Sequence, residues 1–194
     1  TKTLNIALIG CGSWGKNIAR NLHQTGKLAC IYDADHNLSK KLNQNFKLFN
    51  YTINDIFKNE NIQGLVIASA AKTHKDIAEE ALLNNKDVLI EKPFCLSLSD
   101  ATNLSKLAIK KNSVLMVGHL LNYHNAFIKM KDLIKEGKIG KIKNIRAHRL
   151  ALGAIRSHES VVYDLAAHDI SMILSIIQDL PVEISTHSIH LNSN

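Results

Sequence analysis

The stretch "LNIALIGCGSWGKNIAR", residues 4–20, decides the fold of this chain. Residues 4–10 form a short apolar run that predicts a strand, and residues 16–26 have the spacing of a helix that ends at a glycine. Between them, residues 10–15 read GCGSWG and fit the pattern G-x-G-x-x-G. Alone this pattern is weak, but its place after a strand and before a helix is typical of a loop that binds a dinucleotide.

Each position of this loop has a predicted part in holding a pyrophosphate. Gly10 permits the tight turn, Gly12 lets the phosphates approach the backbone, and Gly15 lets the helix pack close to the strand. The phosphates then meet the N–H groups at the positive end of the helix. We expect Ser13 and Trp14, which complete the loop, to lie against the cofactor.

An acidic residue follows at the expected distance. Asp33 closes a second predicted strand, residues 28–33, and lies 23 residues after Gly10. A carboxylate at this place hydrogen-bonds the adenosine ribose hydroxyls and repels a 2′-phosphate. No arginine follows it in "DADHN", so the sequence predicts NAD in preference to NADP. The alternative is that the glycines only make a tight turn and Asp33 only caps a loop.

The same alternation of strand and helix continues to about residue 120. Further strands are expected at residues 47–52, 63–69, 87–93 and 113–119, with helices at 36–46, 53–59, 71–85 and 98–112. Short, apolar, β-branched strands that alternate with helices predict an α/β fold with a doubly wound parallel sheet. We therefore expect an NAD-binding Rossmann domain over residues 1–121.

The remaining residues, 122–194, have a different rhythm. They predict a helix at 125–140, a strand at 141–152, an apolar helix at 161–178 and another strand at 181–191. We expect a small, incomplete α+β domain that serves substrate binding or oligomerisation.

Composition narrows the class of protein. The chain has 194 residues, of which 45% are hydrophobic and 21% charged, as in ordinary folded domains. No apolar run reaches the roughly 18 residues of a membrane span. The three cysteines have neither metal-site spacing nor the pattern of a disulfide framework. We expect a reduced, cytoplasmic protein that binds no metal and no membrane.

The net charge of +7 suggests an anionic partner, either a nucleic acid or a small molecule. Most lysines are scattered over predicted helix surfaces, and the densest basic stretch, residues 129–149, has no interleaved aromatic residues. A solvated helix face is the favoured interpretation, and nucleic-acid binding by residues 129–149 is kept as an alternative hypothesis.

A lysine stands at the carboxyl end of a predicted central strand. In "DVLIEKPF", residues 87–94, Glu91-Lys92-Pro93 follows the strand directly. Ligands of open α/β sheets bind at that edge, so we expect Lys92 to point into the binding cleft. The alternative is a surface lysine paired with Glu91.

The apolar helix "VVYDLAAHDISMILSIIQ", residues 161–178, carries polar residues on one stripe. Asp164 and His168 are four residues apart and share a helix face, while Asp169 lies off that face. The other helix positions are mostly apolar, so we expect the helix to be buried. A neighbouring carboxylate raises the pKa of an imidazole and burial lowers it, which favours acid/base chemistry near neutrality. A purely structural Asp–His pair is the alternative.

Several stretches together resemble one family. They are "IALIGCGSWGKNIAR", "LVIASAAKTHKDIAEEAL", "DVLIEKPF", "LMVGHLLNYHNAF", "GKIGKIKNIRAHRL" and "YDLAAHDI". In this order they are similar to the glucose–fructose oxidoreductase / inositol dehydrogenase (Gfo/Idh/MocA) family over nearly the whole chain. The resemblance implies a dehydrogenase of sugars, cyclitols or their derivatives. The region around residues 149–174 resembles the nucleotide-sugar 3-dehydrogenase branch.

The resemblance also implies roles for individual residues. Lys92 would hydrogen-bond the reacting hydroxyl, Asp164 would position the substrate and His168 would act as general acid/base. We expect further cofactor contacts at Ser69, His74, Glu91 and Lys92 itself. Further substrate contacts are expected at His119, Tyr123, Arg149 and Arg156. The two arginines would bind anionic groups of the substrate.

Some features depart from the family. Asn122 stands where an arginine is common and Asn125 where a proline is common. Family members usually continue much further, so we expect either a fragment or a reduced member. A non-catalytic NAD-binding module is the alternative to an enzyme, and a homo-oligomer is compatible with both.

Overall fold

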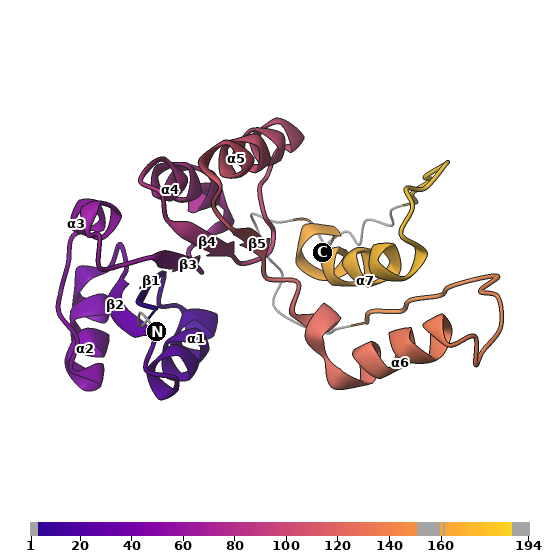
Figure 1. Cartoon of the computed structure of the whole chain (residues 1–194), viewed down its shortest axis with the longest axis horizontal. Coiled ribbons are helices and arrows are strands. Elements are labelled where there is room, and N and C mark those ends of the chain that lie inside the picture. Colours follow the sequence, from indigo (N-terminus) through magenta and orange to yellow (C-terminus); the bar gives the residue numbers. More distant parts are fainter. Residues whose placement is uncertain (1–3, 151–159, 161, 188–194) are drawn as a thin grey trace, which may run out of the picture. The chain divides into compact units, whose positions relative to one another are not determined.

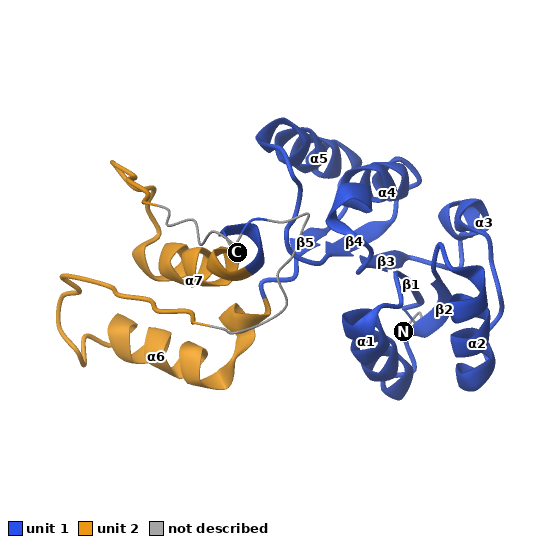
Figure 2. Cartoon of the chain, turned by 180° about the vertical axis from the view of Figure 1, so that it is seen from behind, with its two compact units in different colours: residues 1–119, 156–164 blue, residues 120–155, 165–194 orange. Residues whose placement is uncertain are grey.

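The structure is a computed structural model that describes residues 4–150, 160 and 162–187. The chain forms two compact units, which are described separately below (Figure 2). Unit 1 comprises residues 1–119 and 156–164, and unit 2 comprises residues 120–155 and 165–194. The predicted domain boundary at residue 121 stays a prediction.

Unit 1 is built on a five-stranded parallel sheet of order β2-β1-β3-β4-β5 (Figure 1). The strands are β1 (Ile6–Ile9), β2 (Leu28–Tyr32), β3 (Gly64–Ile67), β4 (Asp87–Ile90) and β5 (Leu115–Val117). The order reverses between β1 and β3, which opens a crevice for ligands at the carboxyl ends of these strands. The predicted Rossmann-type parallel sheet is confirmed.

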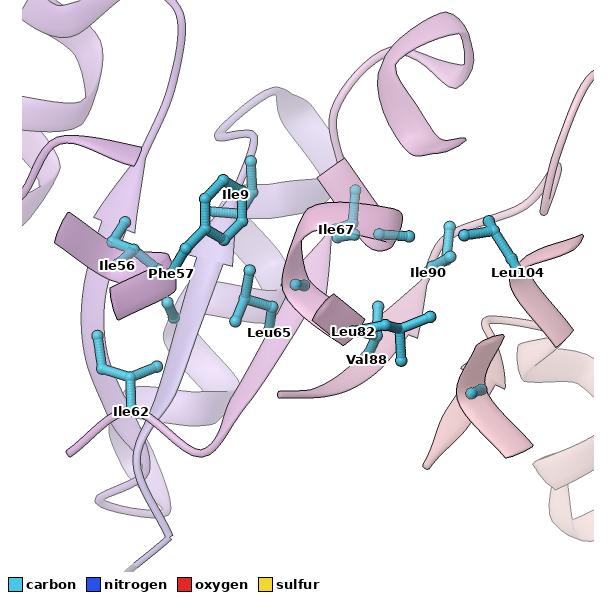
Figure 3. Close-up of a cluster of buried hydrophobic side chains, with 14 of the residues drawn as sticks. Ile9, Ile56, Phe57, Ile62, Leu65, Ile67, Leu82, Val88, Ile90 and Leu104 are labelled. Carbon is cyan, nitrogen blue, oxygen red and sulfur yellow. The ribbon is translucent and has the colours of Figure 1, made fainter. Parts of the chain in front are cut away.

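Helices cover both faces of this sheet. They are α1 (Ser13–Gln24), α2 (His36–Phe46), α3 (Ile53–Lys58), α4 (Ala71–Leu83) and α5 (Leu98–Lys111). Neighbouring strand residues point to opposite faces, so Leu8 packs with α1 and α2 while Ile9 packs with α3 and α4. Figure 3 shows the larger cluster, which joins the sheet to α3, α4 and α5. This two-sided burial explains why the strands are mostly apolar.

The predicted strand at residues 47–52 is wrong, because this segment is the connection between α2 and α3. Lys47 has a left-handed backbone (φ 56°) and ends α2. Thr52 begins α3 with a capping box, in which its hydroxyl accepts from the N–H of Asp55 and the Asp55 carboxylate accepts from the N–H of Thr52. The ends of two helices thus bound this segment, and it pairs with none of the described strands.

In the part of unit 2 that the structure describes, the regular secondary structure is helical. It contains the 3₁₀-helix η1 (Leu120–Tyr123), α6 (Asn125–Lys135) and α7 (Ala167–Ile177), and η1 packs against both helices. The strands expected at 141–152 and 181–191 do not form within residues 141–150 and 181–187. These residues make no backbone–backbone hydrogen bond with other described residues, and a strand needs such a partner. Residues 151, 152 and 188–191 lie outside the described residues.

The helix predicted at 161–178 differs from expectation in two ways. It begins with a π-helical turn, η2 (Val162–Ala166), before continuing as α7. It is also not buried, since Ile170 is 47% exposed and Ile177 is 46% exposed. An apolar helix buries only the faces that neighbours cover, and the described residues of unit 2 cover one side of α7. Among the described residues, no helix combines the length and apolarity that crossing a bilayer requires.

The side chain of Asn43 holds β2 in place beside α2. It is 1% exposed, its Oδ1 accepts from the N–H of Ile31 (2.9 Å), and its Nδ2 donates to the Ile31 carbonyl (2.8 Å). Nδ2 also donates to the side chain of Asn50 (3.0 Å). Ile31 lies two residues before Asp33, so this interaction supports the strand that carries the predicted ribose contact.

We expect Asn43→Ala to lower the free energy of unfolding by about 2–3 kcal/mol, because it leaves buried backbone groups of Ile31 without partners. Urea denaturation followed by circular dichroism measures this loss. Asn45→Ala, at an exposed position of the same helix, is the matched control and should change stability little. Equal effects of the two substitutions would contradict the structural role of Asn43.

Candidate functional site

The glycine loop packs directly against the backbone that follows β3. Gly10 has a φ of +97°, and a β-carbon there would lie 2.5 Å from the Ser69 nitrogen and 2.6 Å from the Ala68 carbonyl oxygen. A β-carbon on Gly15 would collide with the Gly10 carbonyl. Both glycines are therefore required, because a side chain at either position would overlap backbone atoms. The contact places the loop at the crevice between β1 and β3.

The first turn of α1 is shaped to receive an anion. Gly12 is its N-cap, no side chain caps it, and the first turn contains no acidic residue. Apart from its chain neighbours, no atom of a described residue lies within 4 Å of where a β-carbon of Gly12 would be, so the backbone there is open. The N–H groups that begin a helix, together with its positive end, favour phosphate groups. The loop therefore fits the pyrophosphate of a dinucleotide.

Asp33 sits beside this loop as an ionised carboxylate. Its Oδ2 accepts from the N–H of Cys11 (2.6 Å) and its Oδ1 from the N–H of Asp35 (2.9 Å). Burial alone would raise the pKa of Asp33, but these hydrogen bonds and the nearby His36 outweigh burial and hold its pKa below the usual value. Burial and the same carboxylate raise the pKa of the Cys11 thiol to about 12, so this thiol is unreactive.

Lys92 meets Asp164 within unit 1. Lys92 lies two residues after β4, and its Nζ donates to the Asp164 carboxylate (2.6 Å) and to the Asp164 backbone carbonyl (2.8 Å). The two side chains are 19% and 21% exposed. Asp164 belongs to the π-helical turn η2, and such turns are frequent at functional sites. The ammonium group is thus held by two oxygen atoms of one residue at the carboxyl edge of the sheet.

Two other predicted cofactor residues are joined across this edge. The indole Nε1 of Trp14, in the first turn of α1, donates to the Glu91 carboxylate (2.7 Å). Trp14 is 45% exposed, so its ring also faces solvent. The interaction links the glycine loop to the residue that precedes Lys92. Glu91 therefore pairs with Trp14, and the alternative of a surface Glu91–Lys92 pair is not what the structure contains.

His74, predicted as a cofactor contact, lies inside the protein. It is 1% exposed, with Nε2 3.1 Å from the Ser69 carbonyl and Nδ1 2.8 Å from the Pro93 carbonyl. The side chain of Ser69 exchanges a hydrogen bond with Thr73 (2.7 Å). His74 and Ser69 thus lie at the carboxyl edge of the sheet, and His74 faces backbone rather than solvent.

His119 follows β5 at the same edge. Burial lowers the pKa of His119, and the charge of Glu91 only partly opposes this. The imidazole of His119 is therefore neutral at neutral pH.

In unit 2, Arg149 and Asp169 form a two-point ion pair. Arg149 donates from Nε to Oδ2 and from Nη2 to Oδ1 of Asp169, both at 2.7 Å. These bonds lower the pKa of Asp169. Helical periodicity assigns no role to Asp169, because it lies off the face of Asp164 and His168. No sequence motif links it to Arg149, which lies 20 residues earlier. Arg149, predicted to bind substrate, is engaged with this carboxylate.

The other predicted residues of unit 2 are placed separately. His168 lies in α7, where its carbonyl accepts from the Ser171 hydroxyl (2.7 Å), and Asn122 donates to the same hydroxyl (3.4 Å). Tyr123 is 62% exposed at the end of η1. Arg156 lies outside the described residues. The described residues hold no group of three or more side chains suited to a metal ion.

Residues 4–119 match the model of the Gfo/Idh/MocA family, described as an oxidoreductase family with an NAD-binding Rossmann fold. The chain belongs to this family. The family match covers the glycine loop, Asp33 and Lys92, so the resemblance predicted from their sequence motifs is confirmed.

Relatives of known name match most of the chain. The 2,7-anhydro-N-acetylneuraminate hydratase of Escherichia coli is 29% identical over 75% of this chain and 40% of its own length. The UDP-N-acetylglucosamine 3-dehydrogenase of Acidithiobacillus ferrooxidans is 26% identical over 93% of this chain and 56% of its own length. A crystal structure of the latter enzyme superposes with a TM-score of 0.83 at 25% identity, covering 93% of this chain and 58% of that one. The chain spans about half the length of these relatives.

The lowered pKa of His119 predicts a pH-dependent stability. The unfolded chain takes up a proton at the ordinary value of 6.5, whereas the folded chain does so only at lower pH. Between the two values the unfolded state holds more protons, so stability falls as the pH drops below 6.5. We expect urea midpoints between about pH 7 and 5 to fall less in His119→Gln than in the native protein. His148→Gln, at an exposed histidine, should keep the native profile, and parallel profiles for all three proteins would contradict the prediction.

Proposed function

We propose that this chain forms the cofactor-binding part, and some of the active site, of an NAD-dependent dehydrogenase that oxidises a hydroxyl of a sugar or nucleotide sugar to a ketone. The observation that carries this proposal is the Lys92–Asp164 pair, held at the carboxyl edge of the sheet of an NAD-binding family member. A half-buried lysine at this edge, close to a nucleotide-binding loop, is placed for chemistry on a bound ligand.

The cofactor would be held by the open first turn of α1 and by Asp33. When bound, its nicotinamide ring supplies the hydride acceptor. The ionised Asp33 would accept hydrogen bonds from the adenosine ribose hydroxyls and would repel a 2′-phosphate, which favours NAD. Trp14 and Glu91 are proposed to lie along the cofactor, between this loop and Lys92.

The Lys92 ammonium group would act on the substrate oxygen. It has three N–H donors, of which two are directed to Asp164, so one is left for a substrate hydroxyl. Its positive charge would stabilise the oxygen as the hydroxyl proton leaves. Asp164 would hold Lys92 and orient the substrate, and His168 is proposed as the base that takes the proton.

The substrate class rests on the relatives and on charge. One relative is named a UDP-N-acetylglucosamine 3-dehydrogenase, and the net charge of +7 favours an anionic substrate such as a nucleotide sugar. Binding of the anionic group by Arg149 would require this side chain to share or leave Asp169. His119 and Tyr123 are proposed as further substrate contacts.

A second candidate comes from the Escherichia coli relative, which is named a hydratase of an anhydro sugar. An enzyme of this class adds water to its substrate without net oxidation. Mass spectrometry separates the candidates, because hydration adds the mass of water whereas alcohol oxidation removes two hydrogen atoms and leaves NADH.

We expect NADH to quench the fluorescence of Trp14 by energy transfer, since Trp14 is the one tryptophan of the chain and lies in the glycine loop. Titration should give a lower Kd for NADH than for NADPH, by about tenfold or more. Asp33→Asn should bring the Kd for NADPH closer to the Kd for NADH, because it removes the charge that repels the 2′-phosphate. Asp35→Asn is the matched control and should preserve the preference. Equal affinities of the native protein for the two cofactors would contradict the role of Asp33.

We expect Lys92→Met to lower the rate of NADH formation in single turnovers with NAD and a panel of UDP-sugars by about 100-fold or more, with the Kd for NADH unchanged. Lys75→Met, which removes a surface lysine paired with Glu79, should leave the rate unchanged.

The opposite outcome would favour a non-catalytic module. If the chain binds NADH but oxidises no sugar or nucleotide sugar, and Lys92→Met changes nothing, the enzyme proposal fails. Binding of mixed-sequence DNA that falls steeply with salt would instead support the hypothesis of a nucleic-acid binder.

A further inference from the structure

The backbone that carries Lys92 leaves the sheet just before this residue. The N–H of Glu91 donates to the Ile67 carbonyl (2.8 Å), which is the last sheet-type bond of this strand. Residues 92–95 are all described, and they make no backbone–backbone hydrogen bond with another described residue. The position of the Lys92 main chain therefore depends on side chains.

His74 supplies that support. Its Nδ1 lies 2.8 Å from the carbonyl of Pro93, the residue after Lys92, and its ring is almost completely buried. Its other nitrogen, Nε2, lies 3.1 Å from the Ser69 carbonyl. One rigid ring thus spans the backbone that follows β3 and the backbone that follows β4.

The Ser69 end of this span is itself fixed against the glycine loop. The N–H of Ala68 donates to the Ile9 carbonyl (2.7 Å), and the Cα of Gly10 lies against the backbone of Ala68 and Ser69. The contacts therefore run without a gap from Gly10 through Ser69 and His74 to the residue after Lys92. All of them lie within unit 1.

We propose that His74 is a positioning residue, which sets Lys92 at a fixed place relative to the cofactor-binding loop through the carbonyls of Pro93 and Ser69. This inference rests on the proposed function, because the reacting hydroxyl must lie near both Lys92 and the cofactor. A displacement of about 1 Å in a reacting group such as Lys92 lowers a rate by about 100-fold. We call the contacts of His74 with the Pro93 and Ser69 carbonyls the brace, and we expect it to affect the chemical step more than cofactor affinity.

Imidazole suits this task for a chemical reason. Carbonyl oxygens only accept hydrogen bonds, and the ring has a nitrogen on each side that is able to donate. A neutral imidazole donates to one carbonyl at a time, and an imidazolium donates to both. Glutamine has both donor hydrogens on one nitrogen at the end of a flexible chain, so His74→Gln is expected to reach one carbonyl and release the other.

The test measures Lys92 directly and does not depend on activity. Trace labelling with acetic anhydride, read by mass spectrometry of the digested protein, reports the reactivity of each lysine. We expect His74→Gln to raise the labelling rate of Lys92 by about tenfold or more, because Lys92 loses its hold on Asp164. Lys86 is an internal control, since it is 5% exposed and its Nζ binds the carbonyls of Asn59 and Ile62 away from His74.

The outcomes separate the possibilities. A rise for Lys92 alone supports the brace, whereas no rise, or an equal rise for Lys86 from general loosening, overturns it. Leu82→Ala is the matched destabilised variant of α4, because Leu82 is fully buried in the hydrophobic cluster and its side chain takes no part in the hydrogen bonds from Ser69 through His74 to Pro93. It should leave the relative rates of the two lysines unchanged.

Kinetics give a second measurement if the native chain is active. We expect His74→Gln to lower kcat by about 10–100-fold with little change in KM or in the Kd for NADH. If kcat falls only as much as the fraction of folded protein falls, the proposal is overturned. An inactive native chain contradicts the proposed function, and the labelling result then still decides the role of His74.

A variant that fails to fold does not end the test. In the native protein, NMR of the His74 ring should show at least one ring N–H that exchanges slowly with solvent, as a buried hydrogen bond requires. Fast exchange of both ring positions would overturn the brace.

Discussion

The contact between Gly10 and the backbone of Ala68 and Ser69 is the constraint on which the rest of the site depends. A side chain at Gly10 would require the ends of β1 and β3 to separate, because its β-carbon would overlap main-chain atoms that cannot move independently of the sheet. The same closeness brings the first turn of α1 to the crevice where the strand order reverses. One rigid sheet therefore holds both the nucleotide-binding loop and the strand end from which the chain continues to Lys92.

The parts of the fold that local sequence specifies were predicted well. The sheet strands carry apolar residues on both faces, and the helices between them begin at polar caps such as Ser97 and Asp35, so strand and helix signals are strong. The segment at 47–52 misled because "KLFNYT" is apolar and aromatic enough for a strand, while the end of one helix and the capping box of the next decide its structure. Caps at both ends outweigh strand propensity in a segment this short.

Interactions between distant residues were harder to predict. The glycine motif and its acid follow a spacing that local geometry enforces. The place of Lys92 at a strand end also follows from local sequence. The pairing of Arg149 with Asp169, and the burial of His74 against two carbonyls, depend on the path of the chain between the partners. Helical periodicity also assumed a regular α-helix, and the π-helical turn at Asp164 breaks that assumption.

The side chain of Asn43 has one further consequence, for how this sheet meets other chains. β2 is an outer strand, and the free N–H and C=O groups of an outer strand are a template for pairing with a foreign strand. Asn43 hydrogen-bonds both the N–H and the C=O of Ile31, as a neighbouring strand would. These groups of the β2 edge are therefore not available to pair with a foreign strand. Among the described strands, the opposite margin at β5 is then where an added strand would join, and aggregation or strand exchange would proceed from that side.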